Sequence, residues 1–270
     1  MTRTLIVTDS CADLSYERLG DSVMVVPFIY HHESDGKELR DSTYIDDYLS
    51  VDDIHSAGVT YEDLFSRLEY AYQNKLNVIM LYSSGKINRC NEAVFLLVLE
   101  DFKRKYNISY KDMRITALDS GKISQALGIL INNLVELEQK GYGYDQLINY
   151  IKSNKDLYEL EFISDKKGKG LFNTGKRSIY RFDEGKVVKA RKCNSDKLRL
   201  NDLVLRFIND ADLSYPVSIV HNNNELLAHE LYTNIASIAA DLDVIDSTKV
   251  VSSLMGEKSV GLAYKKKVRK

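Results

Sequence analysis

Three short polar loops carry the residues of this sequence that are best suited to chemistry. They read Thr8-Asp9-Ser10, Ser83-Ser84-Gly85 and Asp119-Ser120-Gly121. Hydroxyl groups and backbone N–H groups in such loops can bind a carboxylate or a phosphate, and the start of a following helix favours negative charge. Short Ser/Asp loops also cap helices where no ligand binds. The residues alone therefore leave a binding role and a structural role open.

Each of these loops follows a run of strand-forming residues, at Thr4–Thr8, Asn77–Tyr82 and Arg114–Leu118. Apolar residues with helical spacing occur between the strands, first over Thr60–Gln73 and later up to Gly141. Strands that alternate with helices are typical of a parallel α/β sheet, and such sheets bind ligands beyond the carboxyl ends of their strands. We therefore predict an α/β domain over residues 1–155, with the three polar loops at one edge of its sheet.

Other segments of the sequence predict further elements. The apolar run Ala93–Leu99 is typical of a buried helix, and Ser22–Tyr30 of a strand. Asp35-Gly36 and Asp183-Glu184-Gly185 each predict a hairpin turn. Beyond the second hairpin, the pattern predicts a helix, a strand, a helix and a strand, at Lys197–Asn209, Val217–Val220, Glu225–Ala240 and Lys249–Ser253. We predict a smaller α+β domain over residues 156–270, with a ligand cleft between the two domains.

The composition is that of an ordinary globular chain of 270 residues, with 44% hydrophobic and 28% charged residues. The net charge is −2, although residues 165–192 are strongly basic, and this balance does not indicate a nucleic-acid binder. No apolar stretch approaches the roughly 20 residues that cross a bilayer, so no integral membrane association is expected. Cys11, Cys90 and Cys193 lie far apart, which favours free thiols in a reducing cytoplasm. We expect a cytoplasmic protein.

No pattern in the sequence indicates a catalytic centre, a metal site or a bound cofactor. Gly170–Lys176 fits most of a phosphate-binding P-loop, but Arg177 occupies the place of the Ser or Thr that would hold magnesium. The five histidines have no spacing that would gather them on one metal ion. We therefore assign no catalytic residue, no metal ligand and no cofactor.

Taken together, the ordered loops resemble the DegV family of bacterial fatty-acid-binding proteins. Residues 8–14 resemble its opening T-D-S-x-A-D-L, Val25-Val26-Pro27 its V-V-P, and Ser83-Ser84-Gly85 its S-S-x loop. Asp119-Ser120, with Ser124 and Gly128, resembles its D-S-x-x-x-S-x-G-x-G element, and residues 261–264 its closing segment. The resemblance extends over nearly the whole chain.

This resemblance implies two α/β domains that enclose a long acyl chain, with its carboxylate held by polar loop groups. It also implies a partner, a separate fatty-acid kinase to which the bound acid is presented. Burial of a long hydrocarbon is favourable by about 0.8 kcal/mol per methylene, so binding alone requires no catalysis. On this basis the lipid-binding residues are expected to be Thr8, Asp9, Ser10, Ser56, Ser83, Ser84, Gly85, Arg89, Asp119 and Ser120.

The sequence departs from the family pattern where function is expected. Ser56 keeps only the leading hydroxyl of the family's T-S-Q-P-S, and the family's S-G-T-Y becomes residues 87–90, in which Arg89 offers a positive charge instead of a serine. The histidine of the closing H-x-G-P-G aligns with Leu254, and of that motif only Gly256 remains. These changes are typical of a divergent member.

Two other functions remain open at this stage. The first is an enzyme or sensor that acts on a small anion at the same strand-end loops, which Arg89 and the basic segment would favour. The second is a family member that acts only through contacts with other proteins. Long-chain fatty-acid binding between the two domains is the leading hypothesis.

Overall fold

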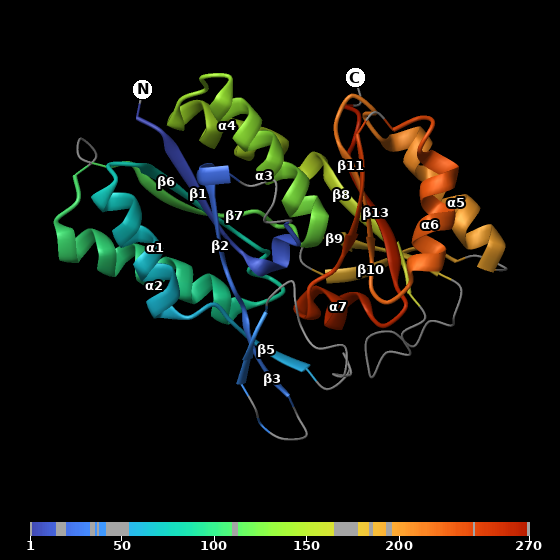
Figure 1. Cartoon of the computed structure of the whole chain (residues 1–270), viewed down its shortest axis with the longest axis horizontal. Helices are drawn as coiled ribbons and strands as arrows, with labels where there is room; N and C mark the ends of the chain where they lie inside the picture. Colours follow the sequence, from blue (N-terminus) through green and yellow to red (C-terminus); the bar gives the residue numbers. More distant parts are fainter. Residues whose placement is uncertain are drawn as a thin grey trace.

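A computed structural model gives the fold of the chain. It describes residues 2–14, 20–32, 36, 38–41, 54–109, 113–164, 178–183, 186–192, 196–239 and 241–268. Two sheets lie side by side, each with its own helices, and helix α3 (Ser124–Gln139) lies between them (Figure 1). The expected basic segment at 165–177, the hairpin residues 184–185 and Cys193 lie outside the described residues.

The first sheet has four strands in the order β2-β1-β6-β7, and every neighbouring pair is parallel. Its strands are β1 (Thr4–Asp9), β2 (Val23–Val26), β6 (Asn77–Tyr82) and β7 (Ile115–Asp119). Because all four run in the same direction, their carboxyl ends share one edge. The predicted parallel α/β sheet is confirmed.

The helices of the first half are α1 (Tyr61–Gln73), α2 (Arg89–Tyr106), α3 and α4 (Tyr144–Asn154). The side chain of Thr60 caps α1 by accepting a hydrogen bond from the Asp63 N–H, as its sequence predicts. Helices α1 and α2 pack together, whereas α3 and α4 lie toward the second sheet (Figure 1). Buried apolar side chains run along α3, from Ala126 to Val135.

The second sheet has six strands in the order β10-β9-β8-β13-β11-β12. They are β8 (Tyr158–Ile163), β9 (Ser178–Asp183), β10 (Lys186–Lys192), β11 (Val217–His221), β12 (Leu242–Asp246) and β13 (Val260–Lys265). All pairs are antiparallel except β11 with β12. The hairpin of β9 and β10 and the α+β character of this half are as predicted.

The central strands β8, β13 and β11 of the second sheet are buried on both faces, and their alternating side chains enter two different cores. Leu160 and Phe162 of β8 belong to the same core as α3, whereas Leu262 and Tyr264 of β13 join the core on the other face. Helices α5 (Asp196–Asp210) and α6 (Glu225–Ile235) cover that other face. Helix α3 therefore packs against both halves of the chain.

Shorter elements complete the fold. They are the strands β3 (Ile29–His32), β4 (Glu38–Arg40) and β5 (Ile54–Gly58), the helix α7 (Lys249–Met255), and the 3-10 turns η1 (Ser10–Ala12), η3 (Gly20–Ser22) and η5 (Lys155–Leu157). Strands β3 and β4 form the antiparallel hairpin predicted around Gly36, and β5 pairs on the other side of β3.

Three sequence predictions were wrong in detail. Residues Lys249–Ser253 belong to helix α7 and not to a strand, because Val250, Val251 and Met255 are buried at helical spacing and their β-branched character misled the prediction. Pro27 divides the predicted strand Ser22–Tyr30 into β2 and β3, since proline cannot donate a ladder hydrogen bond. Helix α6 ends at Ile235, five residues before the predicted end.

The apolar run Ala93–Leu99 is helical but not wholly buried. Phe95 and Val98 lie in the core, whereas Leu96 and Leu97 are 45% and 54% exposed. The strands β5, β8, β12 and β13 and the helix α4 had no sequence prediction.

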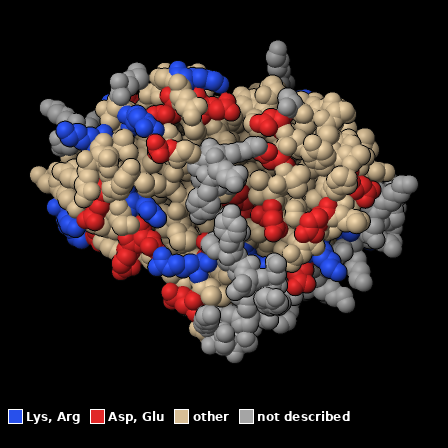
Figure 2. Space-filling view, viewed as in Figure 1, with Lys and Arg blue, Asp and Glu red and all other residues tan. Residues whose placement is uncertain are grey.

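Acidic and basic side chains occur together on the face of the molecule shown in Figure 2, without one continuous field of a single sign. In the described part of the chain, no helix has both the length and the hydropathy that crossing a bilayer requires.

Candidate functional site

The polar loops singled out in the sequence lie at one edge of the parallel sheet. Asp9 ends β1, Ser83 follows β6 and Ser120 follows β7. Strand β6 pairs with both β1 and β7, so the three loops are neighbours. The predicted clustering of these loops at the carboxyl edge is therefore present in the structure.

The buried Asp9 carboxylate connects the first two loops through hydrogen bonds. One oxygen accepts hydrogen bonds from the Ser83 backbone N–H at 2.8 Å and from the Asn91 side-chain amide at 3.0 Å. The other accepts from the Cys11 N–H at 3.1 Å. Burial raises the pKa of Asp9, and these hydrogen bonds oppose that rise. Because internal donors occupy both oxygens, Asp9 holds the loops in place.

Two further buried carboxylates connect this edge to the second half of the chain. The Asp13 carboxylate accepts from the Ser124 hydroxyl at 2.6 Å and from the Thr248 N–H at 2.8 Å. Asp41 accepts from the Ser10 hydroxyl at 2.8 Å and from the Lys249 N–H at 3.2 Å. Burial raises the pKa of Asp13 to about 7 and that of Asp41 to about 6. Helix α7 is thus held at its start by the first half.

A cavity of about 320 Å³ lies between the strand-end loops and α7. The residues that line it come from both halves of the chain and are Cys11, Phe28, Ser83, Ile87, Asn88, Arg89, Cys90, Ile123, Val250, Ser253 and Leu254. Most of its wall is apolar, and Arg89 is its one Arg or Lys among the described residues. We call it the apolar cavity.

Arg89 is placed at this cavity by the start of α2. Asn88 caps the helix, because its side-chain oxygen accepts from the Asn91 N–H at 3.0 Å, and Arg89 is the first helical residue. The Arg89 side chain is exposed and forms no ion pair with any described residue. A guanidinium at a helix N-terminus, beside an apolar cavity and without an ion pair to the described residues, is well suited to hold a carboxylate.

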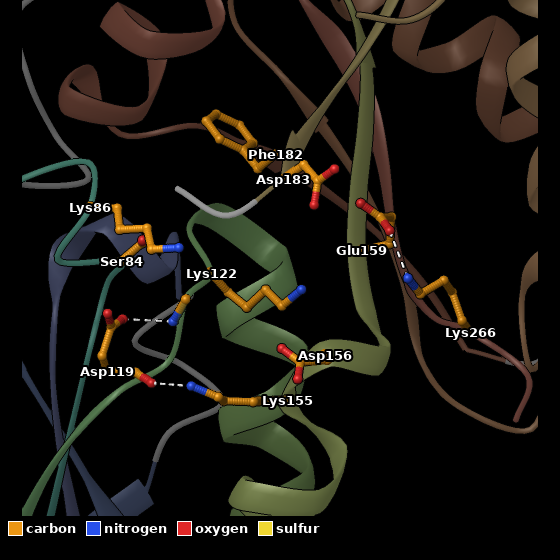
Figure 3. Close-up of a pocket in the computed structure, with 11 residues that line it drawn as sticks. Ser84, Lys86, Asp119, Lys122, Lys155, Asp156, Glu159, Phe182, Asp183 and Lys266 are labelled. Atoms are coloured by element: carbon orange, nitrogen blue, oxygen red, sulfur yellow. Dashed lines mark hydrogen bonds and ion pairs between the residues drawn. The ribbon is translucent and has the colours of Figure 1, made fainter. Parts of the chain in front are cut away.

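A second cavity, of about 450 Å³, lies on the other side of the β6 loop (Figure 3). It is polar, and we call it the polar cavity. The residues that line it are Ser84, Lys86, Asp119, Gly121, Lys122, Lys155, Asp156, Glu159, Phe182, Asp183 and Lys266.

The ten residues expected to bind lipid do not all reach one cavity. Ser83 and Arg89 line the apolar cavity, whereas Ser84 and Asp119 line the polar cavity. Ser56 lies in β5 opposite Tyr30, and its side chain lies outside the described part of the structure.

The other five predicted residues support the loops and line neither cavity. Asp9 and Ser10 make the internal hydrogen bonds already described, and the Ser120 hydroxyl accepts from the Lys122 N–H at 3.0 Å. Thr8 is fully buried, and its hydroxyl has no hydrogen-bond partner in the described chain. Gly85 lies so close to Glu92 that an added Cβ would come within 2.6 Å of that side chain.

Several residues that form the apolar wall had no role predicted from the sequence. Phe28 follows Pro27, Ile123 follows the third loop, and Val250 and Leu254 lie in α7. Phe28 and Ile123 could have been predicted as lining residues, because each lies next to a motif that the sequence identifies. Val250 and Leu254 were not identifiable in this way, because their segment was predicted as a strand.

Known proteins similar to this chain align with it over nearly its full length. No family model matches the sequence. A DegV domain-containing protein of Staphylococcus aureus strain N315 is 25% identical over 99% of this chain and 100% of the relative. A second, from strain MRSA252, is 27% identical over the same shares of both chains.

Solved structures share the fold at lower identity. A DegV lipid-binding protein from Thermotoga maritima superposes with a TM-score of 0.80 at 17% identity, covering all of both chains. DegV from Bacillus subtilis, described as a fatty-acid-binding protein, has a TM-score of 0.80 at 16% identity over 99% of this chain and 100% of its own. The Streptococcus pneumoniae Fatty Acid Kinase (Fak) B3 protein, loaded with linoleic acid, has a TM-score of 0.76 at 17% identity over 98% and 99% of the two chains.

The fold and the site define an α/β protein with two large sheets and one small one, in which the loops at the edge of the parallel sheet form a cavity together with the second half of the chain. Its full-length relatives carry the DegV name, and its fold is that of the DegV structures. The resemblance to the DegV family is confirmed, at the low identity of 25% and 27% to these two relatives.

Proposed function

We propose that this chain binds one long-chain fatty acid in the apolar cavity and catalyses no reaction on it. The observation that carries the proposal is the cavity itself. Apolar side chains from both halves of the chain surround it, and Arg89, the one Lys or Arg among its described lining residues, forms no ion pair with any described residue. A fatty acid has the matching chemistry, with one anionic end and a long apolar body.

The carboxylate is held by Arg89 in this proposal. The guanidinium presents N–H donors in a planar fork that fits a carboxylate. The N-terminus of α2, an 18-residue helix, carries a partial positive charge that also favours an anion. Ser83 lines the same cavity and offers a hydroxyl. The buried carboxylates of Asp9, Asp13 and Asp41 accept hydrogen bonds from internal donors and are not available to bind the ligand.

The acyl chain lies against the apolar wall. Phe28 and Ile123 from the first half face Val250 and Leu254 of α7 across the cavity. Each methylene that leaves water contributes about 0.8 kcal/mol, so the tail provides most of the affinity and the head group fixes the orientation. The volume of about 320 Å³ lies within the usual range of roughly 300–1,000 Å³ for small-molecule sites.

The comparisons support this ligand class, because structures with the same fold are described as lipid-binding or fatty-acid-binding proteins. We divide the chain functionally at residue 155, with residues 1–155 and 156–270 as the two walls of the ligand cleft. Leu160 and Phe162 of β8 and Phe182 of β9 nevertheless share the core of α3 with the first half, so the two parts are expected to move little relative to one another.

We also propose that the bound acid is presented to a separate fatty-acid kinase. The neighbour from Streptococcus pneumoniae carries the name Fatty Acid Kinase (Fak) B3 protein and holds linoleic acid. Arg89 and Cys90 are exposed, so the end of the cavity at α2 is accessible to a partner protein. Presentation at this end would leave the acyl chain buried while the carboxylate reacts.

Titration of oleate into delipidated protein tests the binding site. Arg89→Glu places a negative charge beside the carboxylate, so we expect its affinity to fall by roughly tenfold or more, since charged hydrogen bonds contribute about 1.5–3 kcal/mol. Arg104→Gln is the matched control, because Arg104 lies near the other end of α2 and pairs with Asp101. Wild-type protein that binds no oleate would overturn the proposed function. An Arg89→Glu variant that binds as well as wild type would remove Arg89 from the site.

A further inference from the structure

The polar cavity is built by elements from both halves of the chain. The loop after β6 contributes Ser84, the loop after β7 contributes Asp119 and Lys122, and η5 contributes Lys155. Glu159 of β8 forms the opposite side (Figure 3). The cavity thus lies at the carboxyl edge of the parallel sheet, where open α/β folds bind ligands.

Most of the charged groups at the polar cavity have partners. The Lys266 ammonium pairs with Glu159 at 2.9 Å, and Lys155 donates to the backbone carbonyl of Asp119 at 2.8 Å. Asp183 pairs with Arg181 at 2.9 Å. These contacts give partners to two of the lysines and two of the carboxylates that line the cavity.

Lys122 has no such contact. Its side chain extends across the cavity toward Asp156 and Glu159 (Figure 3), yet its ammonium forms no hydrogen bond or ion pair with any described residue. Lys122 is half-buried, and burial lowers its pKa, because desolvation disfavours the charged form. A partly desolvated cation without a partner is costly, and an anion in the cavity would relieve that cost.

A second group at the same cavity also lacks a partner. Ser84 is 1% exposed, and its hydroxyl makes no hydrogen bond within the described chain. Ser83, the preceding residue, lines the apolar cavity instead. The β6 loop therefore separates two cavities, and an oxyanion in the polar cavity could accept from both Lys122 and Ser84.

We propose that the polar cavity binds a small oxyanion, a carboxylate or a phosphate, with the Lys122 ammonium as its main ligand. Asp119 and Asp156 also line the cavity, so the best ligands carry hydrogen-bond donors of their own beside the anionic group. This site is separate from the proposed fatty-acid site and does not depend on it.

Calorimetric titration of inorganic phosphate, and separately of acetate, into the delipidated full chain at constant ionic strength tests the proposal. We expect saturable binding of at least one anion to wild type, and affinity reduced roughly tenfold or more in Lys122→Gln. Lys152→Gln is the matched control, because Lys152 is an exposed lysine of α4 outside the cavity, and we expect it to bind like wild type. The same titration into oleate-loaded protein distinguishes a site for a free anion from a site for the lipid head group. A separate anion site keeps its affinity for the anion when oleate is bound.

Three outcomes would overturn the inference. They are no anion binding to wild type, equal binding to Lys122→Gln, and loss of anion binding when oleate is loaded. The stability of the variant also tests the role of Lys122. If Lys122 only stabilised the fold, Lys122→Gln would unfold at a lower urea concentration than wild type. We expect the variant to be at least as stable as wild type without anion. Titration of oleate into Lys122→Gln measures the fatty-acid site by itself. A failure of the anion site can therefore be distinguished from a failure of the fatty-acid site.

Discussion

The buried Asp13 carboxylate accepts a hydrogen bond from the backbone N–H of Thr248 at 2.8 Å, although 235 positions separate the two residues in the sequence. Its other oxygen accepts from the hydroxyl of Ser124, at the start of α3. Thr248 immediately precedes α7, which contributes Val250 and Leu254 to the apolar cavity. Asp13 therefore fixes the relative position of the two walls of the proposed ligand site.

The same carboxylate predicts an unusual dependence of stability on pH. The ordinary pKa of Asp13 is 3.8, and burial raises it to about 7, so the native state binds this proton more tightly than the unfolded state. The resulting stabilisation is present below about pH 4 and is lost as the pH rises through about 7. Asp41 acts in the same direction, with a pKa of about 6. Urea denaturation is therefore expected to show higher stability at pH 5.5 than at pH 8.

Asp13→Asn isolates this contribution. The Asp13 backbone is left-handed, with φ of 48°, and asparagine tolerates that conformation well. We expect the variant to lose part of the difference in unfolding free energy between pH 5.5 and pH 8, by roughly 1.4 kcal/mol for each pH unit between 5.5 and the Asp13 pKa of about 7. Exposed Asp21→Asn serves as the control and should keep the wild-type difference. Stability that rises from pH 5.5 to pH 8 in wild type would contradict this account.

A buried ion pair holds α5 on the second sheet. Arg206 binds the carboxylate of Glu161 through two nitrogens, with its Nε at 2.8 and 3.0 Å from the two oxygens, and the Glu161 side chain is only 2% exposed. Arg206→Met leaves that carboxylate buried without a partner, so we expect a loss of about 3–5 kcal/mol in chemical denaturation. The exposed pair of Arg40 and Asp63 gives the comparison, and Arg40→Met should cost less than about 1 kcal/mol.

Replacing both members of the buried pair separates charge from packing. In Arg206→Met/Glu161→Leu no buried charge remains, and most of the lost stability should return. A double variant as unstable as Arg206→Met alone would show that shape, and not the unpaired carboxylate, is responsible.

Gly128 allows α3 to approach the first polar loop. A Cβ at this position would lie 2.7 Å from the backbone oxygen of Ala12, which cannot move aside as a side chain can. We expect Gly128→Ala to destabilise the fold by about 1–3 kcal/mol, although alanine is the better helix former by about 1 kcal/mol. Gly85→Ala meets the side chain of Glu92, whose carboxyl end can move aside, and should cost less. Thermal denaturation of the two variants decides the order, and an equal or smaller loss in Gly128→Ala would refute the close approach.

Leu254 tests the apolar wall without disturbing the core, because it is half-buried at the cavity. Leu254→Ser removes apolar contact area, and we expect oleate affinity to fall roughly fivefold, as about 1 kcal/mol of burial is lost. Leu226→Ser is the control, since Leu226 is 85% exposed on α6. Unchanged oleate binding in Leu254→Ser would place the acyl chain elsewhere.

The local patterns of the first half were sufficient to predict its fold. The run Asn77–Tyr82 is a buried strand, and Thr60 with Asp63 marks the start of α1, because these signals depend only on neighbouring residues. The second half was harder. The short helix α7 carries two β-branched valines, and its conformation is decided by burial against the first half, which no local pattern contains.

The sequence located the loops of the candidate site but not the direction of their side chains. Ser83 and Ser84 were predicted to act together, yet in the folded chain they line two different cavities. Arg89 was identified because a positive charge replaces a neutral residue of the family motif. The importance of Lys122 depends on the absence of a partner among the described residues, and that becomes apparent only in the folded structure.

Native mass spectrometry of freshly purified protein tests the central claim most directly. We predict a population whose mass exceeds that of the chain by one fatty acid, and release of that acid on denaturation. The Arg89→Glu variant, purified in the same way, should carry less of it. Protein that is empty as purified, and remains empty after incubation with a panel of long-chain fatty acids, would contradict the proposed function.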